Sequence, residues 1–472
     1  MLSRLRLVCL ASLLLLMAAC GGKSVPPRDG SAPSWMGTIA DLRQFPQNLE
    51  VYAKNAGQNK RLISQAEQNR QLARFDRIFF GPWEMRKTSM RKRDVAAIFN
   101  KARGYKQGSE RWTQTEWDAM ARNANLKNFP TRAQTAITVR NTDLREMPTH
   151  LTRFSEPTPD PRANPFDYFQ YSLLPLGTPV LIAHTSSDGR WHFVECPIAG
   201  GWVDAEDLAL VDDSFMSLYR NASFAAVVRD NVRLTDQTAQ YGASASTGGQ
   251  NVSIGTILPA LAGGGVRTSI MPSDPTAPSV TLLAPVKGSN GMARTAPFTV
   301  SSSDVVARPL PLTPDNVAAV GNVMMGQRYG WGGMFGERDC SALTRDLFTP
   351  FGIWLPRNSG GQARVGAVSS LEGMTAREKE DTILRYGVPF LSLVGMRGHI
   401  MLYVGKYDGR PAIFHNVWGV RTVEGNDDNA RFVIGRAVVT SITPGSELKN
   451  LYRGTTFVDR LRTLSTPADT LQ

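Results

Sequence analysis

Cysteine and histidine are scarce in this chain, and their scarcity limits the chemistry it can perform. The 472 residues include four cysteines and five histidines, and none of these form pairs at the spacing of a zinc site. The glycine-rich segment 330–333 lacks the lysine that completes a phosphate-binding loop. We therefore expect no metal site and no cofactor.

The charge is strongly positive, with 53 basic against 41 acidic residues and a formal net charge of +12. This balance suits an anionic partner, which could be nucleic acid, a membrane surface or an acidic cell-wall polymer. The basic stretch 86–93 (RKTSMRKR) is accompanied by no nucleic-acid-binding motif. We interpret it as a solvated helix face and expect no nucleic-acid partner.

A short apolar run, residues 10–19, lies close to the N-terminus. Two arginines precede it, and Met-Ala-Ala-Cys stands at 17–20. The run is too short to span a membrane comfortably, and it resembles a bacterial lipoprotein signal peptide cleaved before Cys20, which would carry the lipid. The alternatives are an ordinary secretory signal or a membrane anchor. Since Gly21 follows in place of an inner-membrane retention aspartate, the resemblance implies a periplasmic protein anchored to the outer membrane of a Gram-negative bacterium.

Few cysteines would remain in the processed protein. Cleavage would remove Cys9 and lipidation would use Cys20, which leaves Cys196 and Cys340. The periplasm is oxidising, but pairing these two would consume the candidate nucleophile described below. We therefore predict no disulfide, and we interpret Cys196 as a structural apolar residue.

The length predicts about three or four domains. Residues 20–38 are rich in Gly, Pro and Ser and predict a flexible tether behind the signal peptide, residues 1–19. Residues 39–126 carry apolar side chains at helical intervals and predict a small helical domain. Within it, Thr113 followed by Glu116 predicts a helix that begins with a capping box.

Short strands with turn signals follow the helical segment. Ser-Asp-Gly-Arg at 187–190 predicts a hairpin, and the segment ending in GWVDAEDL resembles a bacterial Src-homology-3-like (SH3-like) barrel, which we assign to residues 127–212. A second run of short strands, residues 213–306, predicts a more divergent second barrel. Residues 307–465 place helices before strands, as expected of an α+β domain.

The most informative stretch is residues 329–348, YGWGGMFGERDCSALTRDLF. Helical spacing of apolar residues begins directly after its glycines, so we expect Cys340 in the first turn of a helix. Unpaired N–H groups and the helix dipole would lower the pKa of a thiol at that position. The alternative is a buried cysteine that acts as a small apolar residue.

Two histidines follow Cys340 in strands that are predicted to form a hairpin with a turn at Asp408-Gly409. His399 begins the first strand and His415 lies in the second. Because side chains alternate along a strand, a plain two-residue turn would place the two imidazoles on opposite faces of the sheet. A three-residue loop or a β-bulge would place them on one face, where they could act with Cys340 as a triad.

These segments resemble the NlpC-type papain-like cysteine peptidases of bacterial cell walls. The match runs through YGWGG at 329–333, DCS at 339–341, LPRNS at 355–359 with Gln362, GHIMLYVG at 398–405, and His415. The resemblance implies that Cys340 is the nucleophile, His399 the general base and acid, and His415 the residue that orients His399. A Pro-Gly-Asp-Leu turn, common in the family before the base-bearing strand, is missing from residues 387–398, which leaves the shape of that cleft wall open.

The substrate is implied by the same resemblance. Relatives with a helical N-terminal region and two barrels cleave the bond between γ-linked D-glutamate and a diamino acid such as diaminopimelate, often requiring a free N-terminal L-alanine. Asp339 would pair with the alanine ammonium group, Ser341 would add a hydroxyl, and Tyr329 and Trp331 would line the subsite. Asp339 could instead cap the helix, and the two aromatic residues could simply pack the loop.

Two rival functions remain open at this stage. One is a cell-wall amidase or acyltransfer enzyme on the same fold, and the other is a wall-binding adaptor without activity. For the peptidase we expect cell-wall peptides as the partner, lipid contact through Cys20, and a monomer, whereas the adaptor would bind glycan or peptide. The first barrel could close the cleft, but the sequence does not show which face it presents.

Overall fold

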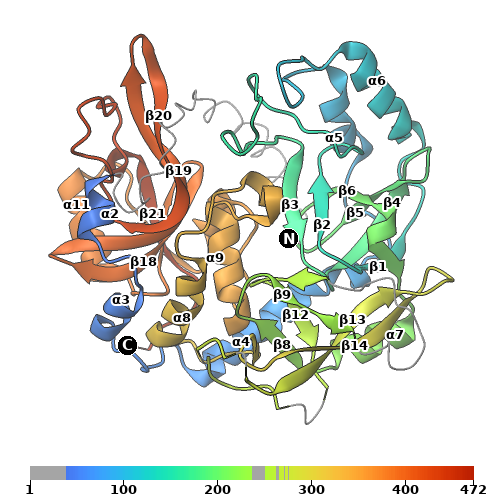
Figure 1. The fold of residues 1–472 in the computed structure, drawn as a ribbon, viewed down its shortest axis with the longest axis horizontal. Helices are drawn as coiled ribbons and strands as arrows, with labels where there is room; N and C mark the ends of the chain where they lie inside the picture. Colours follow the sequence, from blue (N-terminus) through green and yellow to red (C-terminus); the bar gives the residue numbers. More distant parts are fainter. Residues whose placement is uncertain (1–38, 237–249, 262–264, 271, 275, 472) are drawn as a thin grey trace.

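The computed structural model describes residues 39–236, 250–261, 265–270, 272–274 and 276–471 (Figure 1). The predicted signal peptide, the lipidation site Cys20 and the tether lie outside the described residues. Within the described ranges, no helix is long and apolar enough to cross a membrane.

The N-terminal segment is helical, as predicted. Its helices are α2 (Ala40–Gln44), α3 (Glu50–Asn55), α4 (Gln65–Phe79), α5 (Lys92–Ala96) and α6 (Gln114–Asn123), with 3-10 helices η2 (Gly81–Glu84), η3 (Ala97–Asn100) and η4 (Leu126–Asn128). Helix α6 begins with the predicted capping box, in which Thr113 and Glu116 bond each other's backbone N–H groups. Helix α4 begins at the N-cap Ser64, whose hydroxyl accepts from the N–H of Glu67.

The predicted helical N-terminal segment is present, and its helices bury their apolar faces against two neighbouring domains. Tyr52 and Phe75 share a core with Leu347 and Phe414 of the C-terminal domain, whereas Trp117 packs with residues of the first barrel. Figure 1 shows α2 and α3 beside the C-terminal sheet and α5 and α6 beside the first barrel. The segment is rich in polar residues, so each helix has only one narrow apolar face and must bury it against a neighbouring domain.

Buried polar side chains attach the N-terminal segment to the C-terminal domain. Asp41 accepts hydrogen bonds of 2.7 Å from both the N–H and the hydroxyl of Ser441. The amide of Gln68 donates to the carbonyl oxygens of Leu310 and Phe351. The abundance of Gln and Asn in this segment is therefore explained in part by contacts between domains.

The first β unit has the predicted hairpin and a seven-stranded antiparallel sheet in the order β3-β2-β6-β5-β4-β1-β7. Its strands are β1 (Gln134–Thr138), β2 (Thr142–Arg145), β3 (Gln170–Leu174), β4 (Pro179–Thr185), β5 (Trp191–Glu195), β6 (Gly200–Asp204) and β7 (Leu208–Leu210), with η5 (Ala205–Asp207) before the last. The predicted turn at 187–190 joins β4 to β5. Inward side chains such as Leu144, Val180 and Val203 form its core.

The second β unit follows helix α7 (Asp213–Arg220), and its described residues form three small sheets around one core. Their orders are β10-β14-β13, β11-β9 and β12-β8-β15. The strands are β8 (Phe224–Val227), β9 (Val232–Arg233), β10 (Thr235–Asp236), β11 (Asn251–Val252), β12 (Ile257–Pro259), β13 (Ser279–Lys287), β14 (Ala293–Ser301) and β15 (Val305–Ala307).

The C-terminal domain packs helices on a six-stranded antiparallel sheet in the order β16-β21-β17-β18-β19-β20. Its helices are α8 (Pro314–Met324), η7 (Trp331–Gly336), α9 (Cys340–Phe348), η8 (Thr349–Phe351), α10 (Ser359–Gln362), α11 (Ala376–Tyr386) and η9 (Val458–Arg460). Its strands are β16 (Ala367–Ser370), β17 (Leu393–Met396), β18 (His399–Tyr407), β19 (Arg410–Glu424), β20 (Asp427–Thr440) and β21 (Leu461–Thr466). The α+β order is confirmed, and helix α9 lies against β18 and β19.

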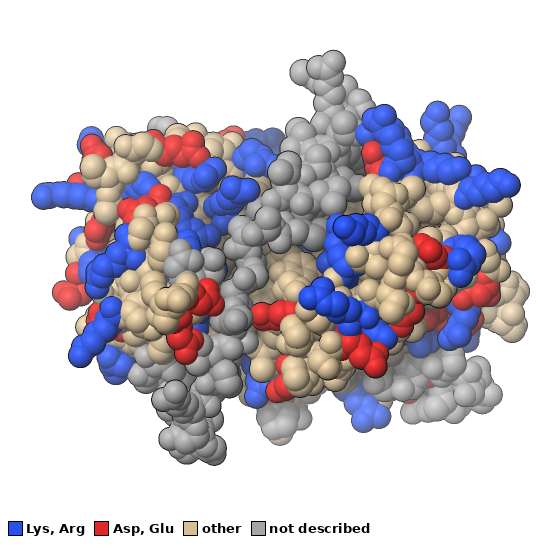
Figure 2. Space-filling model, turned by 90° about the horizontal axis from the view of Figure 1, so that it is seen from above, with Lys and Arg blue, Asp and Glu red and all other residues tan. Residues whose placement is uncertain are grey.

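Charge is distributed over the surface without one continuous basic face in the view of Figure 2. That figure shows Lys and Arg side chains on both halves of the molecule, with Asp and Glu side chains between them. In the basic stretch 86–93, Arg91 forms an exposed ion pair with Asp94. The stretch is solvated as predicted, but the predicted helix face is wrong for most of it, because residues 86–91 lie outside any helix and α5 begins at Lys92.

Candidate active site

Cys340 is the first residue of helix α9, as the sequence predicted. Its predecessor Asp339 is the N-cap, and the Asp339 carboxylate accepts a hydrogen bond of 2.8 Å from the N–H of Ala342. Cys340 is only 6% exposed, yet it lines a cavity of about 430 Å³. Within the described chain Cys340 and Cys196 are both free thiols, and Cys196 is buried.

The two candidate histidines lie on one face of the sheet because strand β18 contains a bulge. The turn at Asp408-Gly409 is a plain two-residue turn, with Tyr407 paired to Arg410. Farther along, Tyr403 pairs with Ile413, and the register shifts by one residue between Tyr403 and Gly405. The shift required for a shared face is therefore supplied by a bulge in the strand, and the loop itself does not supply it.

The imidazoles of His399 and His415 contact each other directly. The distance from His399 Nε2 to His415 Nδ1 is 2.7 Å, and that from His415 Nε2 to the hydroxyl of Thr440 is 3.0 Å. The Thr440 hydroxyl donates its own hydrogen to the carbonyl of Ser441, so it must accept from His415 Nε2–H. His415 Nδ1 then accepts from His399 Nε2–H, and His399 Nδ1 is left unprotonated, the form that a general base needs.

Thr440 is a member of this chain of hydrogen bonds that the sequence did not reveal. It lies on β20, where His415 pairs with Val438, so Thr440 is two residues along and on the same face. The only signal in the sequence is a threonine at the end of a predicted strand. Its role depends on the register between β19 and β20.

Burial keeps both catalytic candidates neutral. Burial lowers the pKa of His399 to about 3, and the positive charge of Arg460 adds to the effect. Burial, reinforced by the Asp339 carboxylate, raises the pKa of the Cys340 thiol to about 12, although the N–H of Ile400 favours the thiolate. The sequence predicted a lowered thiol pKa, and this prediction is wrong because the cost of burying a charge exceeds the stabilisation from the helix end.

Asp339 is held by four different donors. Its carboxylate accepts from Ala342 N–H, Gly332 N–H, the Ser341 hydroxyl and the Arg357 guanidinium, the last at 2.7 Å. Burial opposes ionisation, but the ion pair with Arg357 outweighs it and lowers the pKa of Asp339. The capping role of Asp339, which the sequence left open, is therefore present, and the carboxylate also lines the cavity beside Cys340.

Ser341 and Arg357 form a hydrogen-bonded cluster with Asp339. The Ser341 hydroxyl accepts from Arg357 at 3.0 Å while it donates to Asp339, so its hydrogen is already used within the cluster. Arg357 belongs to the LPRNS segment, but no role of its own was predicted for it. Gln362, from the same match, donates to the carbonyl of Ser341 and fixes the first turn of α9.

Tyr329 and Trp331 line the cavity and also pack the loop, so both interpretations of these residues apply. The ring of Trp331 lies 5.7 Å from Phe166 and 6.0 Å from Tyr168, and Tyr329 lies 5.6 Å from Phe166. Phe166 and Tyr168 precede β3 of the first barrel. This barrel therefore presents the start of β3 to the cleft.

The first barrel also forms one wall of the cavity itself. Tyr168, Gln170 and Tyr171 line it opposite Cys340. The approach is close, since a Cβ atom on Gly332 would lie 2.4 Å from the carbonyl oxygen of Gln170. The expectation that the first barrel closes the cleft is confirmed.

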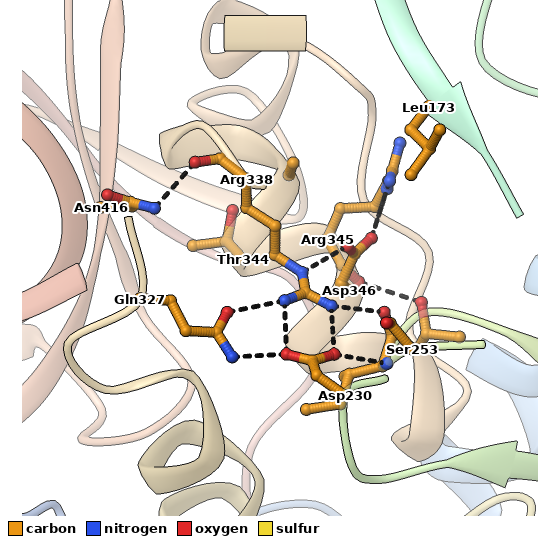
Figure 3. A network of polar contacts seen from close by, with 12 residues as sticks. Leu173, Asp230, Ser253, Gln327, Arg338, Thr344, Arg345, Asp346 and Asn416 are labelled. Atoms are coloured by element: carbon orange, nitrogen blue, oxygen red, sulfur yellow. Dashed lines mark hydrogen bonds and ion pairs between the residues drawn. The ribbon is translucent and has the colours of Figure 1, made fainter. Parts of the chain in front are cut away.

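Arg338, directly before the N-cap, joins the catalytic helix to the second β unit (Figure 3). Its guanidinium donates to both oxygens of Asp230 at 2.8 Å and to Asp346 at 2.8 Å. The backbone carbonyl of Arg338 accepts from the side chain of Asn416, the neighbour of His415, at 2.8 Å. The loop that carries Cys340 is thereby fixed from two sides.

A cysteine at the start of a helix that lies against the two strands carrying a hydrogen-bonded histidine pair is typical of a site of the papain-like cysteine peptidase class. Residues 326–427 match the model of the NlpC/P60 family. Residues 8–129 match that of the "NLPC_P60 stabilising domain, N term", and residues 153–204 match an SH3 domain of the SH3b1 type. The chain thus carries an NlpC/P60 cysteine peptidase domain, preceded by a stabilising domain and an SH3 domain.

A solved structure shows the same fold over most of this chain. An NlpC/P60 endopeptidase from Photobacterium damselae subsp. piscicida is 23% identical, and the match covers 91% of this chain and 98% of that one with a TM-score of 0.76. An NlpC/P60 family protein from Bacillus cereus ATCC 10987 is 17% identical, with 71% of this chain and 100% of that one covered and a TM-score of 0.45. No match was found among curated proteins.

No group of three or more His, Cys, Asp and Glu residues that could hold a metal ion occurs in the described part of the chain. The side chains of Cys340, His399 and His415 are the candidates for a nucleophile, a base and an orienting group. Backbone N–H groups at the start of α9 are available for an oxyanion.

Proposed function

We propose that this peptidase hydrolyses the bond between γ-linked D-glutamate and an L-diamino acid in peptides of the bacterial cell wall. The observation that carries the proposal is the ordered chain His399–His415–Thr440 on the sheet against which helix α9 lies, with Cys340 at the start of that helix lining a cavity that the SH3 domain also lines. The NlpC/P60 match supports hydrolysis of cell-wall peptides in general. The choice of bond rests on the resemblance described for the sequence.

The reaction begins from a neutral thiol and a neutral imidazole. His399 Nδ1 accepts the proton of Cys340 as the sulfur attacks the amide carbonyl, and the N–H of Cys340 stabilises the oxyanion. The imidazolium of His399 then donates its proton to the leaving amine, and a thioester remains. Water, deprotonated by His399, attacks the thioester and releases the acid and the thiol. His415 and Thr440 hold the ring of His399 in the required tautomer and orientation.

The size of the cavity favours short free peptides over the intact polymer. A cavity of about 430 Å³ is in the range that accepts a ligand of a few residues. Tyr168 and Tyr171 of the SH3 domain form a wall that a cross-linked glycan strand would have to displace. We therefore propose released tripeptides and tetrapeptides as substrates.

We further propose that the substrate carries a free N-terminal L-alanine, whose ammonium group would bind at Asp339. Asp339 is already paired with Arg357, so an alanine ammonium group would have to share the carboxylate with that guanidinium. Tyr329, Trp331 and Ser341 lie around the same corner of the cavity. Comparison of the free and the N-acetylated peptide separates a substrate-binding Asp339 from one that is only structural.

We further propose that Cys20 carries a lipid and that the enzyme works in the periplasm, attached to the outer membrane. The support is the sequence of residues 10–21 alone. Metabolic labelling with a fatty acid, compared between the natural chain and the Cys20→Ala variant, tests the anchor separately from the activity.

Mass spectrometry of purified protein incubated with L-Ala-γ-D-Glu-diaminopimelate tests the reaction. We expect L-Ala-D-Glu and free diaminopimelate, and we expect no products from the Cys340→Ala variant. The Cys196→Ala variant is the matched control, because it removes the other free thiol and should keep the activity. An intact peptide, or cleavage between L-Ala and D-Glu, would contradict the proposal.

A further inference from the structure

We propose that Phe457 is a positioning residue for the histidine pair: its ring covers one side of the hydrogen bond between His399 and His415 and keeps water away from it. Phe457 lies in the connection 441–460 between β20 and β21, beyond residues 326–427, which match the NlpC/P60 model. The inference rests on the proposed function and adds a residue that neither the sequence motifs nor the family match identified.

The ring of Phe457 contacts both imidazoles nearly at right angles. Its centroid lies 6.0 Å from that of His399 at an interplanar angle of 75°, and 6.0 Å from that of His415 at 79°. The two imidazole centroids are 5.0 Å apart. The three rings therefore form a triangle, and edge-to-face contacts of this kind favour one orientation of each ring.

The triangle covers a hydrogen bond that water would weaken. The distance from His399 Nε2 to His415 Nδ1 is 2.7 Å, His415 is fully buried, and His399 is 7% exposed. A hydrogen bond is stronger in an apolar surrounding than in water, because solvent competes for both partners. Phe457 and His399 together line a cavity of about 100 Å³. Removal of the phenyl ring would therefore extend this cavity toward the pair and admit water.

Contacts on both sides of Phe457 hold its backbone in place, and we call residues 456–460 the cap segment. The carboxylate of Asp459 accepts from the N–H and the hydroxyl of Thr456, at 2.8 and 2.7 Å. The ammonium group of Lys379 on α11, which is 3% exposed, donates to the carbonyls of the two residues after Phe457, at 3.0 and 2.8 Å. A buried ammonium group needs such acceptors, and here they fix the cap segment to α11.

The alternative is that Phe457 only fills the core on this side of the sheet. It packs, as Met374 does, against the apolar cluster that includes Ile383 of α11 and Met401 of β18. A ring with this role alone would affect stability and nothing else. A ring that excludes water from the histidines would also affect their protonation, because desolvation disfavours the imidazolium.

The charged groups that act on the pair are not part of Phe457. Burial is the largest cause of the low pKa of both imidazoles; for His399 the charge of Arg460 in the cap segment adds to it and that of Asp339 opposes it, and for His415 the neighbouring His399 adds to it. None of these groups changes in Phe457→Ala. Water admitted by this substitution should therefore raise both pKa values toward 6.5.

Exchange of the C2 hydrogen of each histidine with deuterium, followed by mass spectrometry over a series of pH values, measures protonation without a substrate. We expect the midpoints of His399 and His415 well below pH 6.5 in the natural protein, and a rise of about one pH unit or more for both in Phe457→Ala. Phe457→Leu keeps an apolar cover and should retain most of the natural behaviour. His150, an exposed histidine of the first barrel, is the internal reference and should exchange alike in all variants.

The pH profile of kcat/KM with L-Ala-γ-D-Glu-diaminopimelate is the second readout. If the pKa of His399 rises to about 6, kcat/KM at about pH 5 should fall about tenfold relative to that at about pH 8. Met374→Ala is the matched control, because Met374 packs against the same core and lies outside both cavities. It should lower the thermal midpoint and leave the acid limb and the exchange midpoints unchanged.

Unchanged exchange midpoints in folded Phe457→Ala, or equal shifts in Met374→Ala, would overturn the inference and leave the proposed function intact. If Phe457→Ala does not fold, Lys379→Met, which releases the cap segment from α11, replaces it with the same expected rise. Failure of the natural protein to cleave the peptide would contradict the proposed function alone, since the exchange midpoints do not depend on the substrate.

Discussion

The guanidinium of Arg338 donates hydrogen bonds of 2.8 Å to both carboxylate oxygens of Asp230, across the junction between the peptidase domain and the second β unit. Only one residue, Asp339, separates Arg338 from the nucleophile. Both charged side chains are almost completely buried. The second β unit is thereby connected to the start of α9 through a largely buried ion pair.

Asp230→Asn should destabilise the protein, because it leaves the buried charge of Arg338 with a neutral partner. Breaking a buried pair typically costs about 3 kcal/mol, and the bond to Asp346 retains part of the compensation. Urea titration measures the decrease in the free energy of unfolding. The change in kcat shows whether the loss of the ion pair also disturbs the position of Cys340. Asp381→Asn, which breaks an exposed pair with Arg377, should show no measurable change. Equal urea midpoints for both variants would contradict the prediction.

Thr440→Val should slow catalysis without weakening substrate binding. The valine keeps the shape of the side chain but cannot accept from His415 Nε2–H, so the tautomer that places a free lone pair on His399 Nδ1 is no longer fixed. We expect kcat to fall by about tenfold or more, in line with the loss of an orienting group, with KM unchanged. Thr463→Val is the control, since the Thr463 hydroxyl is buried with no hydrogen-bond partner. A fall in KM alone, or no change in kcat, would show that Thr440 has no part in orienting His415.

Acid should destabilise the folded protein between pH 6.5 and about pH 3. Burial holds the pKa of His399 at about 3 and that of His415 well below 6.5, whereas the same residues in the unfolded chain take up protons near pH 6.5. Over this range the unfolded state binds more protons, so the free energy of unfolding falls as the pH falls, by about 1.4 kcal/mol per pH unit for each histidine. Urea titrations at a series of pH values measure the slope. The double variant His399→Asn, His415→Asn should have a shallower slope, and an unchanged slope would refute this origin.

Gly332→Ala should loosen the contact between the SH3 domain and the peptidase domain. Gly332 has a φ of +65°, and its added Cβ would lie 2.4 Å from the backbone oxygen of Gln170. Gly336→Ala is closely matched, because Gly336 has a φ of +74° but open space around the new Cβ. Both variants carry the backbone strain of about 1 kcal/mol, and only the first carries the clash. We expect a lower thermal midpoint and a higher KM for Gly332→Ala than for Gly336→Ala, and identical values would contradict the close approach.

The parts of the site that could be predicted are those set by local sequence. Cys340 opens a helix because glycines end and helical spacing begins there, and His399 opens a strand because a turn precedes it. Thr440 and Arg460 could not be predicted, since both reach the site through strand register and a C-terminal loop that local patterns do not specify. The neutral state of Cys340 was also missed, because the degree of burial depends on the SH3 domain that covers it.

The domain against which each N-terminal helix packs could not be predicted either. Their periodicity was sufficient to identify helices, and the capping box at Thr113 is present as expected. The surface against which each apolar face packs is determined by tertiary structure. Helix α3 packs against the C-terminal domain, and helix α6 packs against the first barrel. A truncated protein without residues 39–126 would therefore expose apolar surface on two domains at once.

His415 can contact His399 only if both side chains lie on the same face of the sheet, and the pairing register of β18 and β19 decides this. A regular hairpin with the turn at Asp408-Gly409 would place the two rings on opposite faces of the sheet. The single extra residue between Tyr403 and Gly405 shifts the register by one and places both rings on the same face. Deletion of Val404 would leave every catalytic residue in the chain and every strand in the sheet, but would turn one histidine away from the other. Under the proposed mechanism, the activity of this peptidase requires a residue at position 404, although the side chain of Val404 takes no part in the reaction.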